Sequence, residues 1–126
     1  MRYSFLAVVA AAVAAVVTAP LPGLQAGQVD VLAAEARRNG ATWTFTVTVE
    51  HADTGWDHYA DAWRVVGPDG TVFGTRVLAH PHVNEQPFTR SLSGVSIPTS
   101  VERVRIEGHD SVHGWGGATV TVDLVN

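Results

Sequence analysis

The chain has 126 residues, with 8 basic and 12 acidic side chains, a formal net charge of −4, no lysine and no cysteine. An acidic surface without a basic cluster repels phosphate, so nucleic acid is not expected as a partner. The lack of cysteine excludes disulfides, thiol catalysis, iron–sulfur clusters and copper–thiolate centres. A functional site must therefore be built from imidazole, carboxylate, amide, hydroxyl or backbone groups.

Residues 1–26 are typical of a cleaved secretory signal peptide. Arg2 supplies a positive start, and the segment 5–19 consists almost entirely of small apolar residues. Cleavage is predicted after Ala26, because the alternative, earlier cut would place Pro20 directly behind it. The apolar run is shorter than the ~20 residues that span a bilayer. We therefore expect no membrane span after cleavage and a periplasmic or secreted location.

Residues 27–126 are predicted to form one all-β domain of about seven strands, with no helical pattern. The clearest strand is 43–49, where apolar and threonine side chains alternate along the chain. His51 continues the inward parity of this strand. Asn39-Gly40, just before it, favours a type I′ hairpin turn. The other expected strands lie at 29–37, 62–66, 71–79, 87–93, 101–108 and 118–124.

This order of strands resembles the immunoglobulin or fibronectin type III architecture, an antiparallel β-sandwich. Trp63, on the third expected strand, is in the position of a core tryptophan, although the disulfide of antibody domains is missing. The resemblance concerns architecture alone, and a fold by itself implies no function.

All six histidines are expected at one end of this sandwich. If successive strands alternate in direction, the loop after the second strand, the segment 80–86 and the glycine-rich loop 109–117 share that end. The histidines concerned are His51, His58, His80, His82, His109 and His113. The same segments carry further candidate binding side chains, namely Trp56, Trp115, Asp57, Asp110 and Glu85.

Clustered imidazoles indicate a metal site, because imidazole is the commonest side-chain ligand for zinc and copper. In His80-Pro-His82, proline favours an extended chain, which points both rings to the same side. His51 is the predicted third ligand, and His109 or His113 the fourth, with His58 a further candidate. Asp57 and Asp110 are the carboxylates expected to orient the rings through hydrogen bonds. Without sulfur, zinc or cupric ion fits better than cuprous ion.

Three other interpretations remain open. The same Trp/His/Asp-rich loops are typical of a non-enzymatic recognition module that binds an envelope protein or a saccharide. Clustered histidines would also form a pH-responsive surface, and they can serve structural hydrogen bonding alone. A hydrolase triad from His109, Asp110 and Ser111 is disfavoured, because adjacent residues on an extended chain point apart. The expected role is metal storage, delivery or accessory work rather than catalysis.

Overall fold

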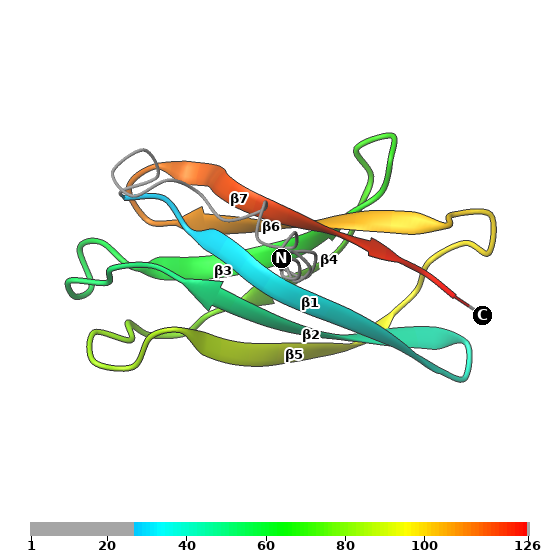
Figure 1. Cartoon of the computed structure of the whole chain (residues 1–126), viewed down its shortest axis with the longest axis horizontal. Coiled ribbons are helices and arrows are strands. Elements are labelled where there is room, and N and C mark those ends of the chain that lie inside the picture. Colours follow the sequence, from blue (N-terminus) through cyan, green and yellow to red (C-terminus); the bar gives the residue numbers. More distant parts are fainter. Residues whose placement is uncertain (1–26, 126) are drawn as a thin grey trace, which may run out of the picture.

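A computed structural model describes residues 27–125, and within them the chain forms seven β-strands and no helix (Figure 1). The strands are β1 (Asp30–Asn39), β2 (Thr42–Glu50), β3 (Ala60–Val66), β4 (Val72–Val77), β5 (Phe88–Val95), β6 (Arg103–Asp110) and β7 (Gly114–Asp123). The predicted signal peptide, residues 1–26, lies outside the described residues. Inside them, no helix is long and apolar enough to cross a membrane.

The strands form two antiparallel sheets. One has the order β1-β2-β5 and the other β4-β3-β6-β7. Buried side chains from both sheets form a single hydrophobic core, so the sheets pack face to face (Figure 1). The predicted all-β fold of about seven antiparallel strands is therefore confirmed.

The core follows the predicted alternation of β2. Phe45 and Val47 are fully buried and pack with Trp63 of the opposite sheet. Each such side chain contributes about 1.5–3 kcal/mol by leaving water. On the outer face of the same sheet, Thr48 of β2 shares a hydrogen bond with Thr89 of β5. The two faces of β2 are therefore assigned correctly by period-two alternation.

The turn between β1 and β2 differs from the predicted type I′ turn. Asn39 pairs with Thr42, so the two central residues are Gly40 and Ala41. Among them only Gly40 has a positive φ, of 67°. A glycine in the first central position is typical of a type II′ turn. Like a type I′ turn, it matches the right-handed twist of the flanking strands. The sequence pattern predicted the hairpin correctly, but its two central turn residues lie one position later than predicted.

The glycine-rich loop predicted at 109–117 is instead a tight hairpin between two strands. β6 continues to Asp110 and β7 begins at Gly114, which leaves three residues in the turn. Gly114 ends the turn with a φ of 79°, in the left-handed region that favours glycine. Gly117, which lies at a register shift in β7, has a φ of 80°. The glycines serve the backbone of a hairpin rather than a mobile loop.

The same glycines make room for the segment that leads into β1. A Cβ on Gly108 would lie 2.5 Å from the Val29 side chain, and a Cβ on Gly117 would collide with the Val29 carbonyl oxygen. Asp30 also accepts a hydrogen bond from the Ala118 amide at 2.9 Å. The start of the described chain is thus fixed against β6 and β7, beside the turn that joins them (Figure 1).

Candidate functional site

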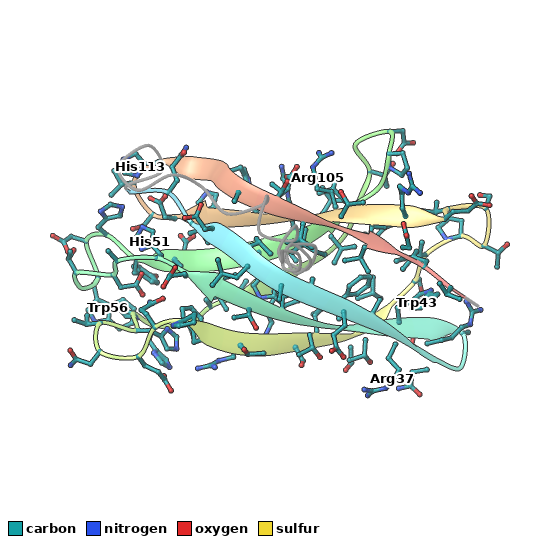
Figure 2. The ribbon with its side chains drawn as sticks, in the orientation of Figure 1. Arg37, Trp43, His51, Trp56, Arg105 and His113 are labelled. Atoms are coloured by element: carbon teal, nitrogen blue, oxygen red, sulfur yellow. The ribbon has the colours of Figure 1, made fainter. Side chains whose placement is uncertain are left out.

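The histidines gather at one end of the two sheets, as the alternating strand directions predict. Antiparallel pairing brings the ends of β2, β4 and β6 to the end of the molecule where β3, β5 and β7 begin. Figure 2 shows His51, Trp56 and His113 at this end, and Trp43 and Arg37 toward the other. The structure divides the six histidines into three separate groups.

The first group, called the His51 cluster below, consists of His51, His58, His113 and Asp110. The ring centroids of His51 and His58 lie 4.7 Å apart, and those of His58 and His113 lie 5.0 Å apart. His51, His58 and Asp110 each offer one ligand atom, and these three atoms all lie within 4.8 Å of one another. Side chains from three different segments of the chain therefore converge on one point.

His51 is held in a fixed orientation by Asp53. Its Nδ1 lies 2.6 Å from Asp53 Oδ1, and both side chains are fully buried. Asp53 also accepts hydrogen bonds from the amides of Ala60 at 3.0 Å and His82 at 2.7 Å. A carboxylate that accepts from one ring nitrogen leaves the other free to bind a metal, which is the usual arrangement around ligating histidines. The other nitrogen, Nε2, faces into the cluster and lies 3.1 Å from the Gly27 carbonyl oxygen.

Asp110 contributes a buried negative charge to the same point. It is 0% exposed, and its Oδ1 accepts from the amides of Val112 at 2.9 Å and His113 at 2.7 Å. Burial alone would raise the pKa of Asp110, but the bonds from His113 and Val112 lower it below its usual range. Among the described residues, its Oδ2 has no hydrogen-bond partner. Its Oδ1 lies 3.3 Å from His58 Nε2, so an ionised and buried carboxylate borders the cluster, where it favours a cation.

The second group is the pair His80 and His82. Their rings lie 4.6 Å apart, so they do share a side of the chain as predicted from the proline between them. However, Arg90 Nη2 lies 2.8 Å from His82 Nε2, and the ring of His82 stacks on Phe88 at 3.8 Å. Burial, then the charge of Arg90 and then that of His80, lower the pKa of His82. His82 is therefore neutral, with its accepting nitrogen already used.

The third group lies on the outer face of the four-stranded sheet. His109 points away from the core because its neighbour Asp110 points inward, and successive strand residues face opposite sides. Its Nδ1 bonds to Asp61, and its ring meets the edge of Trp115 with centroids 4.7 Å apart. The guanidinium carbon of Arg64 lies 3.8 Å above the Trp115 ring. His109 is thus separated from the His51 cluster by the sheet itself.

Three remaining candidates lie on exposed loops at the same end. Trp56 is 68% exposed and packs edge-on against Tyr59, with ring centroids 5.5 Å apart. Asp57 and Glu85 are also exposed. The carboxylates that orient His51 and His109 are Asp53 and Asp61, which were not assigned from the sequence. The pattern His51-x-Asp53 did carry a signal, because residues two apart on an extended chain face the same side.

Fold and site together define a class: a small, all-β protein of two packed sheets with a histidine–carboxylate cluster at one end. No family model matches the chain. It is 40% identical over 106 residues to a "Putative lipoprotein" from Halomicrobium mukohataei, an alignment that covers 84% of this chain. The same alignment covers 51% of that relative, so the chain spans about half of its length.

Among solved structures, the fold is similar to the crystal structure of a hypothetical protein from Pyrococcus horikoshii OT3. The TM-score is 0.51 with 14% sequence identity, over 86% of this chain and 96% of that chain. At this level of identity the similarity concerns the fold alone. It supports the arrangement of seven strands in two sheets.

Proposed function

We propose that the chain is an exported β-sandwich protein that binds a divalent transition metal, zinc or cupric ion, in the His51 cluster. Export is supported by the signal-like pattern of residues 1–26 and by the description of the relative from Halomicrobium mukohataei as a lipoprotein. The chain contains no cysteine, so a thiol-linked lipid is not part of the proposal. The expected role is storage, delivery or accessory work at the cell envelope.

One observation carries the metal assignment: two imidazole nitrogens and a carboxylate oxygen converge within 4.8 Å at a buried point. The carboxylate belongs to Asp110, whose Oδ1 lies 3.3 Å from His58 Nε2. Two histidines and one carboxylate are a known ligand set for zinc, with a further position left open. Nitrogen and oxygen donors without sulfur suit zinc or cupric ion.

Within the two-sheet fold, we propose the fibronectin type III arrangement. β4 pairs with β3, so the fourth strand joins the sheet of β3, β6 and β7. In constant-type immunoglobulin domains the fourth strand joins the other sheet instead. Trp63 is fully buried on β3, the strand that carries the core tryptophan in immunoglobulin domains, so it fits a sandwich of either kind and does not separate the two.

The metal assignment is tested by titrating the purified protein with Zn²⁺ and Cu²⁺ while bound metal and melting temperature are measured. Site-selective binding raises the melting temperature in a saturable manner. Asp110→Asn keeps the oxygen that accepts from the backbone but removes the charge, and we expect it to weaken binding by about tenfold or more. Glu102→Gln removes a negative charge from an exposed position at the opposite end of the molecule and is the control.

Two results would overturn the metal assignment. One is the absence of saturable binding of either ion, and the other is an Asp110→Asn protein that binds as tightly as the unmodified protein. If Asp110→Asn does not fold, His58→Gln replaces it, because the His58 side chain is 24% exposed and tolerates a change better. His80, His82 and His109 stay predicted ligands until their variants are compared in the same titration.

A recognition module is the second candidate function, supported by the outer face of the four-stranded sheet. A surface depression of about 380 Å³ there is lined by residues that include Tyr59, Asp61, His109 and Trp115. Trp115 is 37% exposed, and an aromatic ring beside paired polar groups suits a saccharide or a protein side chain. Binding of envelope saccharides that is lost in Trp115→Ala, with metal affinity unchanged, would favour this function.

A further inference from the structure

Gly27, the first described residue, places its backbone inside the His51 cluster. Its carbonyl oxygen lies 3.1 Å from His51 Nε2 and 3.1 Å from His58 Nε2. His58 Nε2 is also 3.3 Å from Asp110 Oδ1. A tetrahedral site with bonds of about 2.0–2.1 Å has edges of about 3.3 Å between its ligand atoms. The three measured separations match such edges, and the ligand atoms of His51, His58 and Asp110 all lie within 4.8 Å of one another.

The contact between His51 and Gly27 has the geometry that a metal ion could take over. Asp53 accepts from the backbone amides of Ala60 and His82 and lies 2.6 Å from His51 Nδ1, which fixes the ring. His51 Nε2 then points at the Gly27 carbonyl oxygen, at hydrogen-bond distance for a nitrogen that carries hydrogen. A metal ion in the cluster would replace that hydrogen and be bound by both atoms.

Glycine suits position 27. In the uncut chain its φ is 95°, a conformation that other residues rarely adopt, and a Cβ there would lie 2.5 Å from His113 Cε1, so a larger residue would require the His113 ring to move. The residues that follow are fixed as well, because a Cβ on Gly116 would collide with the Gln28 side chain. The backbone of residue 27 is thus both shaped for this position and anchored in it.

We propose that Gly27 is a ligand of the metal, through its carbonyl oxygen and, once the chain is cut after Ala26, through its free α-amino group. The amine nitrogen and the carbonyl oxygen of one residue close a five-membered chelate ring on an ion, a stable arrangement for cupric ion in particular. Removal of the signal peptide would then complete the site, and unprocessed chains would bind more weakly. This inference rests on the proposed metal function and deepens it.

The chain offers a selective way to test the amine. It contains no lysine, so after cleavage behind Ala26 the α-amino group is the sole primary amine. The protein is produced as the full chain and exported, and its first residue is determined by mass spectrometry. A portion is then acetylated, with hydroxylamine treatment to restore histidine and tyrosine. A second form begins at Ala26 instead of Gly27. It keeps a free α-amino group but moves that group by one residue, so it tests whether the position of the amine matters.

The Cu²⁺ affinities of the three forms are measured by competition titration, and the ligand nitrogens by electron paramagnetic resonance. We expect both the acetylated form and the form that keeps Ala26 to bind about tenfold or more weakly than the processed form, with one nitrogen ligand fewer. Circular dichroism confirms that all three forms are folded.

The possible outcomes separate the two proposals. If processing starts the protein at a residue other than Gly27, or if acetylation leaves the affinity unchanged, the amine is not a ligand. In that case His58→Gln still weakens binding, and the proposed metal function stands. If the processed, unmodified protein does not bind Cu²⁺ or Zn²⁺, both proposals are overturned together.

Discussion

The His51 cluster and the His80–His82 pair lie at the same end of the molecule, yet their chemistry is opposite. In the first, Asp53 and Asp110 surround the rings, and an imidazole nitrogen faces a carbonyl oxygen. In the second, Arg90 contacts the ring nitrogen that a metal would need. Both groups have neighbouring rings, so the spacing of the rings does not distinguish them.

The difference lies in the charges around the rings. Carboxylates lower the energy of a cation bound between nearby imidazoles. A guanidinium raises that energy, and here it also donates to the lone pair of the ring nitrogen that would bind the cation. Phe88 further encloses His82, whose Nδ1 is buried without a partner among the described residues. His82 is therefore held by packing and by Arg90 while His80 is exposed, whereas the rings of the His51 cluster have carboxylate neighbours.

Asp53 links the two groups, so its removal has the largest expected effect. Asp53→Ala would leave the amides of Ala60 and His82 and the ring of His51 without their acceptor, and we expect a loss of about 3 kcal/mol in the free energy of unfolding. Urea unfolding measures this loss. Asp57→Ala, at an exposed position, should change stability by less than about 0.5 kcal/mol. Equal effects of the two changes would contradict the central role of Asp53.

Paired histidine variants test the comparison directly. We expect His51→Gln with His58→Gln to weaken zinc binding by about 100-fold or more, because two ligands are lost. His80→Gln with His82→Gln should change the affinity by less than about threefold. Isothermal titration calorimetry on both double variants provides the measurement. The reverse order of effects would restore His80 and His82 as the leading ligands.

The pH dependence of stability should be carried in part by His82. Its pKa is lowered in the folded state by burial and by the charges of Arg90 and His80, so the folded state favours the neutral ring. The resulting stability is present above the unfolded pKa of about 6.5 and is lost as the pH falls through the lower, folded pKa.

Arg90→Gln removes one of the causes and should move the pKa of His82 back toward its ordinary value. The loss of stability on acidification then becomes smaller, which urea unfolding at several pH values would detect. Nuclear magnetic resonance titration of the His82 ring gives the pKa itself. A ring pKa that does not change in Arg90→Gln would show that the guanidinium has no effect on it.

Much of the fold was predictable because local rules decide it. Alternation along β2 identified its buried face and the inward position of His51, which is 3% exposed. Antiparallel strands then required that all six histidines share one end. These steps depend on period and direction alone, and both can be read from the residues.

The grouping of the histidines depends on details that the sequence pattern does not carry. His109 and Asp110 were treated as parts of one open loop, but the strand continues through them and sends them to opposite sides of the sheet. Asp53 is a local partner of His51, but Gly27 joins the cluster through contacts with His51 and His58, which are 24 and 31 residues away in the sequence. Such contacts follow from tertiary packing and register rather than from local propensity.

The anchoring of Asp30 beside Ala118 also bears on the order in which the molecule folds. The two residues are 88 positions apart, so their contact closes almost the whole described chain into one loop. Contacts with such long sequence separation form late, because the entropy of loop closure must be overcome first. The proposed cation site combines Gly27 from one end of this loop with Asp110 from near the other. On this proposal, a nascent chain lacks the site until β6 and β7 have been synthesised and have folded.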